Sequence, residues 1–326
     1  MLIKTVRTKL SLVVSLVMAA VLALALAACG NANTEEASVA KIGTLATEDF
    51  LPMWLADEQS YFEENGIDVE ITIFQSAQEL SAALAAKAID GAMTDIPVAA
   101  NLTAGGTPMT VSWITLGATP EEGRFGIMVG PNSDITDVKQ LAGVPVGVGS
   151  GTMLEYIMDE LMLDAGIPKD QIKKEELKKL PARFQVVMEG NTAAGVFPGS
   201  LLALGESQGA KVIIDDTKGD NLSQSVMGMR SEFVEANPKA MEALKAAWNK
   251  AAEEINANPE DYRELMIKNA TLPENLQQSY PVPSYPQVTL PTDEQAQKIL
   301  DWMLELGYLK GEVSYDSKTG ALVAQE

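Results

Sequence analysis

Short apolar segments alternate with helical segments along most of this chain, and this alternation restricts the fold more than any other feature. In the first part of the pattern, the expected strands are 41–45, 69–74, 91–94 and 109–116, and the expected helices are 52–65, 76–87 and 97–104. Strands that alternate with helices in this way build a parallel sheet covered by helices on both faces. We therefore expect an α/β fold whose first sheet is built from residues 41–116.

The same pattern begins again after Gly123 and predicts a second sheet. Its expected strands are 124–129, 145–148, 175–179, 193–197 and 212–214, and its main expected helices are 153–165 and 181–190. Residues 226–229 then predict a strand that returns to the first sheet. Expected helices at 231–258, 259–269 and 292–306 follow, and we expect this helical tail to pack on the first half of the fold.

The first 28 residues have the pattern of an export signal. Three basic residues precede an uncharged run at 10–28, and the run ends in the string Leu26-Ala27-Ala28-Cys29. A retained membrane anchor is an alternative, because a span needs roughly 20 apolar residues. The string resembles a bacterial lipobox, which favours cleavage before Cys29 and acylation of this cysteine, and two or more acyl chains bind membranes stably. We expect an extracytoplasmic protein, lipid-anchored at the periplasmic side or outer face of the cell membrane.

Residues 29–38 are small, polar and acidic, and they predict a flexible tether before a folded part that begins near Val39. The formal charge of the chain is −21, and removal of residues 1–28, which hold three basic residues and no acidic one, changes it to −24. A charge of this sign argues against nucleic acids and against broad contact with anionic lipids. We expect no nucleic-acid partner, and membrane contact only through the lipid anchor.

The chain contains no histidine, and Cys29 is its only cysteine. These counts exclude zinc sites made from cysteine and histidine, a serine–histidine–aspartate triad and an intramolecular disulfide. Enzymes that use carboxylates or lysine remain an alternative. We expect a binding protein that is not an enzyme and has no catalytic residue, metal or cofactor.

Several short strings, behind the lipobox and in this order of elements, resemble a known family. They are DFLP at 49–52, YFEENGIDV at 61–69, IDGA at 89–92, LAG at 141–143 with VGV at 146–148, and GAKVI at 209–213. Together they resemble the substrate-binding proteins of ABC importers of the nitrate/sulfonate/taurine and thiamine-pyrimidine type. One enzyme of this group, the thiamine-pyrimidine synthase, consumes its own histidine, so the absence of histidine excludes that reaction here.

The resemblance implies a periplasmic-binding-protein fold of type II, with two doubly wound lobes joined by two hinge strands. Lobe 1 would comprise 39–123 and 225–326, including the helical C-terminal tail, and lobe 2 would comprise 124–224. A small polar solute, such as a sulfonate, a thiamine pyrimidine or a similar nitrogen or sulfur compound, would bind between the lobes. Closure about the hinges would trap it for delivery to an ABC permease by a monomeric protein. An exported enzyme and a sensory lipoprotein on the same fold are alternatives.

In open α/β sheets, ligands bind beyond the carboxyl ends of the strands, and four loops meet this condition. They are 47–50, 94–97, 150–153 and 197–200. The candidate ligand-binding residues on these loops are Glu48, Asp49, Phe50, Thr94, Asp95, Ser150, Gly151, Thr152, Phe197 and Pro198. Phe50 and Phe197 are expected on loops as walls or stacking surfaces, whereas Trp54 and Trp113 fit the core.

The helix-start loop and the acidic loops favour different solutes. Residues 149–152 suit an anion at the N-terminus of the following helix, although Ser150 or Thr152 could simply cap that helix. Asp95 could accept from an amine, or it could cap the helix that starts near Pro97. The adjacent acids at 48 and 49 favour a cationic or amine-bearing solute.

Arginine is the side chain best suited to pair with a carboxylate or sulfonate. The candidates, Arg124, Arg183 and Arg230, lie away from the four loops, which disfavours a simple anion. A zwitterion or a polar heterocycle would satisfy both sets of loops.

Overall fold

The structure is a computed structural model that describes residues 38–325, apart from residues 120, 121, 219–221, 223, 271, 273, 275 and 310. The expected signal at 1–28, the expected acylation of Cys29 and the expected tether up to residue 37 lie outside the described residues. Across the described part of the chain, no helix combines the length and the apolar character needed to cross a bilayer.

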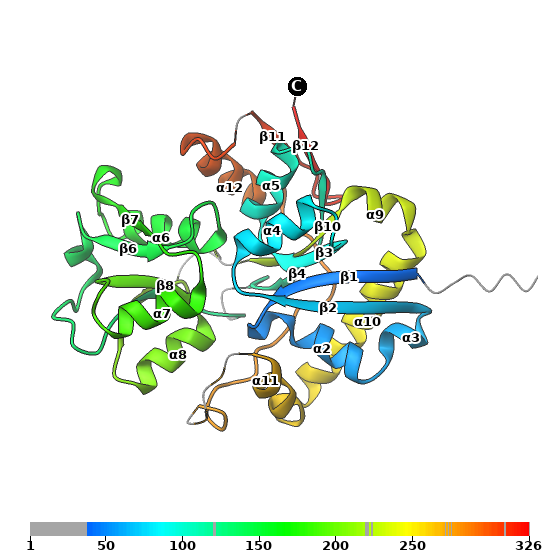
Figure 1. Ribbon diagram of the computed structural model, residues 1–326, viewed down its shortest axis with the longest axis horizontal. Coiled ribbons are helices and arrows are strands. Elements are labelled where there is room, and N and C mark those ends of the chain that lie inside the picture. The colour runs from blue at the N-terminus through cyan, green and yellow to red at the C-terminus, as the bar shows by residue number, and fades with distance from the viewer. Residues whose placement is uncertain are drawn as a thin grey trace, which may run out of the picture. The chain divides into compact units, whose positions relative to one another are not determined.

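The first sheet has the strand order β2-β1-β3-β10-β4 (Figure 1). Its strands are β1 (Ser38–Leu45), β2 (Ile67–Phe74), β3 (Gly91–Thr94), β4 (Met109–Leu116) and β10 (Ser225–Arg230). The prediction that residues 226–229 return to this sheet is confirmed, because β10 lies between β3 and β4. β1 is parallel to β2 and β3, whereas β10 is antiparallel to both of its neighbours.

The second sheet has the strand order β7-β6-β8-β5-β9. Its strands are β5 (Phe125–Val129), β6 (Pro145–Val148), β7 (Lys173–Glu176), β8 (Ala194–Pro198) and β9 (Lys211–Asp215). β6 is parallel to β7 and β8, but β5 is antiparallel to β8 and β9. The expectation of parallel sheets was therefore wrong for one strand in each sheet.

The antiparallel strand in each sheet is the first strand after the chain arrives from the other sheet. β5 follows β4 of the first sheet, and β10 follows β9 of the second. A parallel pair of strands is joined by a crossover helix, which dictates the direction of the second strand. A strand that enters from another sheet has no such crossover, so the strand–helix alternation does not predict its direction.

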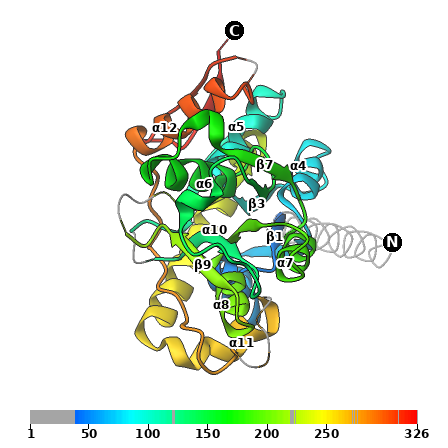
Figure 2. The same cartoon turned by 90° about the vertical axis from the view of Figure 1, so that its left-hand side faces the viewer.

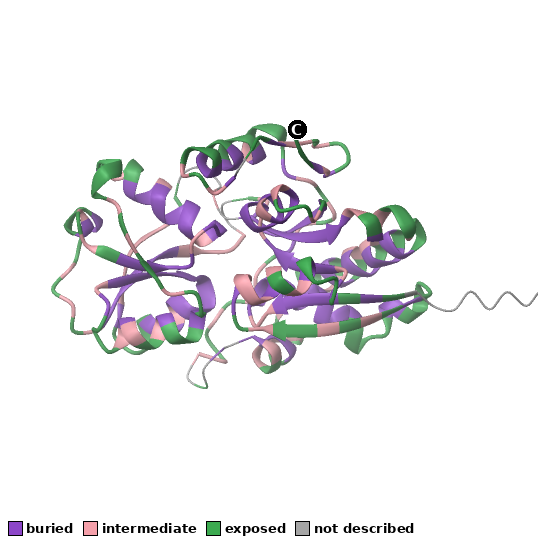
Figure 3. Ribbon diagram, turned by 45° about the horizontal axis from the view of Figure 1, so that its top comes forward, coloured by how far each residue is buried: buried purple, intermediate pink, exposed green. Residues whose placement is uncertain are grey.

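Helices cover both sheets, and strands such as β3, β4, β8 and β10 are buried, whereas the edge strands β2 and β7 are largely exposed or half-buried (Figure 3). The α-helices are α2 (Leu51–Glu58), α3 (Tyr61–Glu64), α4 (Ala77–Ala85), α5 (Ile96–Ala104), α6 (Met153–Asp164), α7 (Leu180–Met188), α8 (Gly199–Ser207), α9 (Ser231–Ala236), α10 (Pro238–Ala257), α11 (Arg263–Asn269) and α12 (Asp293–Glu305). Short 3-10 turns are η1 (Glu48–Phe50), η2 (Val138–Leu141), η3 (Lys169–Gln171) and η4 (Pro259–Tyr262), and a small hairpin joins β11 (Val313–Tyr315) to β12 (Leu322–Ala324).

Two of the expected helices are each divided. The helix expected over 52–65 becomes α2 and α3, because Ser60 has a left-handed backbone with φ of 59°. The helix expected over 231–258 becomes α9 and α10, which meet at Asn237. Asn237 precedes a proline, and a residue in that position avoids the helical conformation.

The helical tail packs on the first half of the fold and also reaches the second. Trp248 of α10 packs against Trp113 of β4, with ring centroids 5.8 Å apart. Trp302 of α12 contacts Tyr156 of α6, with ring centroids 5.4 Å apart, and its Nε1 donates to Asp159 at 2.9 Å. Residues of α5, α6 and α12 share one buried apolar cluster, and these helices lie in the same part of the molecule (Figures 1 and 2). The prediction that the helical tail packs on the first half was therefore incomplete, because α12 also packs against α6 of the second half.

Candidate functional site

A cavity of about 90 Å³ lies where the carboxyl ends of strands from both sheets meet. A single water molecule needs roughly 10–15 Å³ on this measure, so the cavity has room for several waters or for a small solute. Half of the lining residues have polar or charged side chains, although most of the lining surface is apolar. Its residues are Leu45, Thr47, Asp49, Ser76, Ala77, Gln78, Leu80, Met93, Thr94, Asp95, Phe125, Gly149, Thr152, Met153, Leu154, Lys178, Leu180, Arg183, Pro198 and Ser225.

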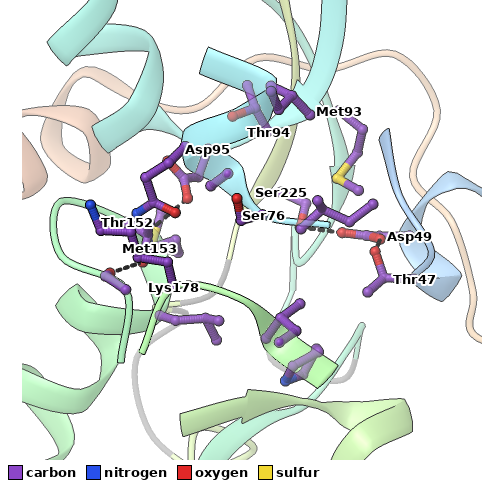
Figure 4. Close-up of a pocket in the computed structure, with 18 of the residues that line it drawn as sticks. Thr47, Asp49, Ser76, Met93, Thr94, Asp95, Thr152, Met153, Lys178 and Ser225 are labelled. Atoms are coloured by element: carbon purple, nitrogen blue, oxygen red, sulfur yellow. Dashed lines mark hydrogen bonds between the residues drawn. The ribbon is translucent and has the colours of Figure 1, made fainter. Parts of the chain in front are cut away.

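Asp49 is a buried carboxylate on the side of the cavity formed by the first sheet. It accepts from the hydroxyl of Thr47 and from that of Ser225, each at 2.6 Å (Figure 4). Ser225 begins β10, so this contact ties η1 to the strand that returns from the second sheet. Burial, together with the neighbouring charge of Glu48, raises the pKa of Asp49 to about 6.

Asp95 joins the two halves of the fold at the cavity. Its Oδ1 accepts the backbone N–H of Val98 at 2.7 Å, which caps α5, and its Oδ2 accepts the N–H of Met153 at 2.8 Å (Figure 4). Burial raises the pKa of this carboxyl to about 6, and the two N–H donors oppose the rise. Asp95 is therefore a helix cap that also binds the start of α6.

Arg183 supplies a buried positive charge to the cavity. It lies in the first turn of α7 and is 1% exposed. Its Nε donates to the carbonyl of Leu177 at 2.8 Å and its Nη1 to that of Val196 at 2.9 Å. Burial lowers the pKa of the guanidinium to about 10, so it stays charged at neutral pH.

The third nitrogen of that guanidinium is available for a ligand. Nη2 of Arg183 has no hydrogen-bond partner among the described residues, and a Cβ on Gly149 would lie 3.3 Å from it. Arg183 lies outside the four predicted loops, as expected, but its side chain lines the cavity, which the loops alone did not predict. A sequence signal was present: Leu180, Arg183, Phe184 and Val187 have helical spacing, and a lone arginine interrupts this apolar face.

Two further polar atoms of the lining lack partners within the described part of the chain. They are Oε1 of Gln78 and Oγ1 of Thr94, and both atoms are buried. Buried polar groups are nearly always hydrogen-bonded, so unpaired ones beside a cavity fit contact with water or with a ligand. With Arg183, they offer a ligand one charged donor, one hydroxyl that can donate or accept, and one amide oxygen that can only accept.

Of the ten candidate ligand-binding residues predicted from the sequence, half line the cavity and half do not. The five that line the cavity are Asp49, Thr94, Asp95, Thr152 and Pro198, and the five that do not are Glu48, Phe50, Ser150, Gly151 and Phe197. Strand ends were therefore a useful guide to the neighbourhood of the cavity. They did not determine which side chain of each loop turns inward.

The two phenylalanines were expected on loops, and this expectation was wrong. Phe50 lies in η1 and Phe197 within β8, and both are 0% exposed. Phe50 packs edge to face on Trp54 at 5.5 Å, and Phe197 packs likewise on Phe184 at 5.9 Å. Both rings are part of the apolar core. Trp54 and Trp113 also lie in the core, as predicted for these two residues.

The other three residues outside the lining bind protein partners. Glu48 accepts from the N–H of Ser200 at 3.0 Å and from the hydroxyl of Tyr280 at 2.6 Å. Ser150 donates its hydroxyl to Glu176, and the N–H of Gly151 donates to Glu155.

The start of α6, which the sequence suggested for an anion, is already satisfied by carboxylates of the protein. Asp95 accepts from Met153 and Glu155 accepts from Gly151, whereas Thr152 turns its hydroxyl to the carbonyl of Gly149 at 2.7 Å. α6 has no side-chain cap from its own N-cap residue. The positive guanidinium of Arg183 is therefore better placed than this helix end to meet an anion. Among the described residues, no group of three or more acidic or cysteine side chains is arranged to hold a metal ion.

Two mixed five-stranded sheets, with a cavity at their strand ends, form the fold of type II periplasmic binding proteins. The chain belongs to the NMT1/THI5-like family, whose model matches residues 47–262. No curated protein sequence matches it significantly.

Solved structures share the fold at low sequence identity. The periplasmic aliphatic sulphonate binding protein SsuA of Escherichia coli is 20% identical, with a TM-score of 0.68 over 84% of this chain and 94% of that one. The ligand-binding component of an ABC-type import system from Staphylococcus aureus is 17% identical, with a TM-score of 0.70 over 83% and 92%. The periplasmic nitrate-binding protein NrtA of Synechocystis PCC 6803 is 19% identical, with a TM-score of 0.68 over 84% and 83%.

Proposed function

We propose that this protein is the solute-binding component of an ABC importer and that its solute is a small anion. The observation that carries the proposal is the buried guanidinium of Arg183, whose Nη2 has no partner among the described residues and which lines the same cavity as the unpaired hydroxyl of Thr94. An arginine held by two carbonyls is pre-positioned and loses little freedom when it binds an oxyanion. Two proteins that share this fold bind a sulphonate and nitrate, and both of these solutes are anions.

Closure of two lobes would trap the solute, with lobe 1 formed by 39–123 and 225–326 and lobe 2 by 124–224. Two contacts across the cavity support this movement. Asp95 binds the N–H of Met153, and Glu79 of α4 pairs with Lys179 before α7 at 2.7 Å. Such contacts at the rim of a cleft stabilise the closed form and break when the lobes separate.

The proposal includes export and acylation at Cys29, which would hold a monomer beside its permease without a membrane-spanning segment. The composition supports a binder without catalytic function, since the chain has no histidine and no cysteine other than Cys29. Acidic residues 48 and 49 are consistent with this role, because each is held by protein hydroxyl or N–H groups.

Thermal unfolding and calorimetry of the full-length protein with methanesulfonate, nitrate, acetate and methylammonium test the proposed function. At least one anion should stabilise the protein saturably, by about 2.7 kcal/mol at 100 times its Kd, and methylammonium should not. Arg183→Gln should abolish the effect. The matched variant Arg263→Gln should retain it, because Arg263 pairs with Glu260 away from the cavity. Stabilisation by methylammonium alone, or equal loss in both variants, would contradict an anion site at Arg183.

A further inference from the structure

A groove with a cavity volume of about 530 Å³ lies between α6, in the second half of the fold, and α12 of the C-terminal tail. Its lining residues fall within 156–163 of α6, the segment 169–174, and 298–306 of α12. This α6–α12 groove is separate from the cavity that contains Arg183, because the two share no lining residue. It has room for an organic molecule of several heavy atoms.

The three lysines that line the groove already have carboxylate partners. The ion pairs are Lys169 with Glu305, Lys174 with Asp159 and Glu155, and Lys298 with Glu294. Because each ammonium group is neutralised by the protein itself, the lysines do not give the groove a net positive charge.

Two carboxylates of the groove, one from each helix, are not neutralised in this way. Within the described part of the chain, Glu160 of α6 forms no hydrogen bond or ion pair, and Asp301 of α12 accepts only from the neutral amide of Gln297, at 2.8 Å. Burial, with the charges of Asp164 and Asp159, raises the pKa of Glu160, and two lysines of the groove only partly oppose the rise. The groove therefore has an excess of negative charge.

A third carboxylate of the groove has a buried oxygen without a partner. Asp159 is 5% exposed, and its Oδ2 accepts from Nε1 of Trp302 and from Nζ of Lys174, each at 2.9 Å. Its Oδ1 has no hydrogen-bond partner among the described residues. Buried polar atoms are nearly always hydrogen-bonded, and because Asp159 lines the groove, a ligand bound there can supply the donor.

The rest of the lining is apolar or aromatic. Its residues are Tyr156, Leu163, Ile172, Trp302 and Leu306. The ring of Trp302 already lies near a cation, since Nζ of Lys174 is 5.9 Å from the ring centroid. A ligand that matches this lining carries positive charge for the carboxylates and hydrocarbon for the apolar walls.

We propose that the α6–α12 groove is a second ligand site and that it binds an alkyl diamine, whose two ammonium groups meet Glu160 and Asp301 while its methylene chain covers the apolar walls. A metal ion fits less well, because no three acidic side chains of the described residues are arranged to hold one. This site goes beyond the proposed function, since the diamine binds outside the cavity that contains Arg183.

Calorimetry of the full-length protein with 1,5-diaminopentane tests the site. 1-Aminopentane, which lacks the second ammonium group, should bind about three- to fivefold more weakly, and pentanedioate should not bind. Glu160→Gln and Asp301→Asn each remove one carboxylate and should each raise the Kd of the diamine by about three- to fivefold. Glu160 is half-buried without a partner and Asp301 is exposed, so both variants should fold.

Glu253→Gln is the matched control, because Glu253 is an exposed residue of α10 outside the groove and its replacement changes the net charge by the same amount. It should keep the Kd of the wild type. An equal loss of affinity in Glu160→Gln and Glu253→Gln would mean that the diamine binds only through the overall negative charge, which overturns the site. Binding of pentanedioate, or no binding of the diamine, overturns it as well. Each of these results leaves the anion site at Arg183 intact, so the two proposals fail separately.

Discussion

The carboxylate of Asp95 accepts the backbone N–H of Met153 at 2.8 Å, so a side chain of the first half of the fold satisfies the start of a helix in the second. Glu48 does the same for α8 through the N–H of Ser200 at 3.0 Å. Neither α6 nor α8 has a side-chain cap of its own. Because free N–H groups at a helix start need acceptors, these two carboxylates stabilise contact between the two halves.

Replacement of Asp95 by alanine should shift the protein towards a more open form. A hydrogen bond to a charged group contributes about 1.5–3 kcal/mol, so its loss should change the closed-to-open ratio by about tenfold or more. The free energy of unfolding is a poor measure of this effect. The variant loses two hydrogen bonds, but it also removes the cost of burying a charged carboxylate, and the two changes partly cancel. Small-angle X-ray scattering should give a larger radius of gyration for Asp95→Ala than for the wild type.

Ser76→Ala is the matched control for Asp95→Ala. Ser76 caps α4 by accepting the N–H of Glu79 at 3.2 Å, and this bond stays within the first half of the fold. The variant should lose about 1 kcal/mol of stability without opening the protein. Equal radii for the two variants would mean that the bond from Asp95 to Met153 does not hold the halves together.

Stability should fall between about pH 4 and pH 6 because of Asp49, and Asp95 should add to the fall. Its pKa is raised from 3.8 to about 6 in the folded protein. The folded state therefore holds a proton that the unfolded state has released in this range, and stability declines as pH rises until the folded carboxyl is ionised. The free energy of unfolding falls by about 1.4 kcal/mol per pH unit between the unfolded pKa of 3.8 and the folded pKa of about 6. Ionisation of Asp49 therefore lowers the stability by about 3 kcal/mol over this range.

Urea unfolding at several pH values measures this effect. Asp49→Asn should show a smaller decline over this range than the wild type and should be more stable at pH 7.5. Asp68→Asn, which changes an exposed residue of β2, should follow the wild type. A wild-type profile that rises between pH 4 and pH 6, with no difference for Asp49→Asn, would contradict the assignment.

The tail contact between Tyr308 and Glu155 should stabilise the protein more than an ordinary tyrosine hydrogen bond. The hydroxyl of Tyr308 donates at 2.6 Å to the buried carboxylate of Glu155 on α6. The hydroxyl of Tyr315 donates to a neutral carbonyl, that of Pro291, at 3.1 Å. Tyr308→Phe should therefore cost about 2 kcal/mol and Tyr315→Phe about 1 kcal/mol in urea unfolding. The reverse order would show that the contact with α6 contributes little.

Replacement of Cys29 by alanine should release the protein from the membrane. Acyl chains stabilise membrane binding by about 0.8 kcal/mol per buried methylene, and an alanine cannot carry them. Labelled palmitate should enter the wild type and not the variant, and the variant should appear in the soluble fraction after cell lysis. If the variant stays in the membrane fraction, residues 10–28 act as a retained anchor instead.

Much of the architecture followed from local patterns. The alternation of strands and helices predicted both sheets, and the pattern at 226–229 predicted a strand of the first sheet. A cap at Asp95 was one of the two roles predicted for this residue, because a cap depends on residues within one helical turn. Strand ends led to the cavity, since parallel strands bring their carboxyl ends to one edge.

Residue types and spacing along the chain thus determined the elements of this protein and the loops near its cavity. Only the tertiary structure decided which side chains meet there. Arg183 lies inside a helix, and its role depends on how α7 is turned against β8. Asp95 and Met153 are 58 residues apart, and their bond exists only because the two sheets face each other. Local patterns record interactions within a few residues, whereas a binding site is built from contacts between distant segments, which packing of the whole core brings together.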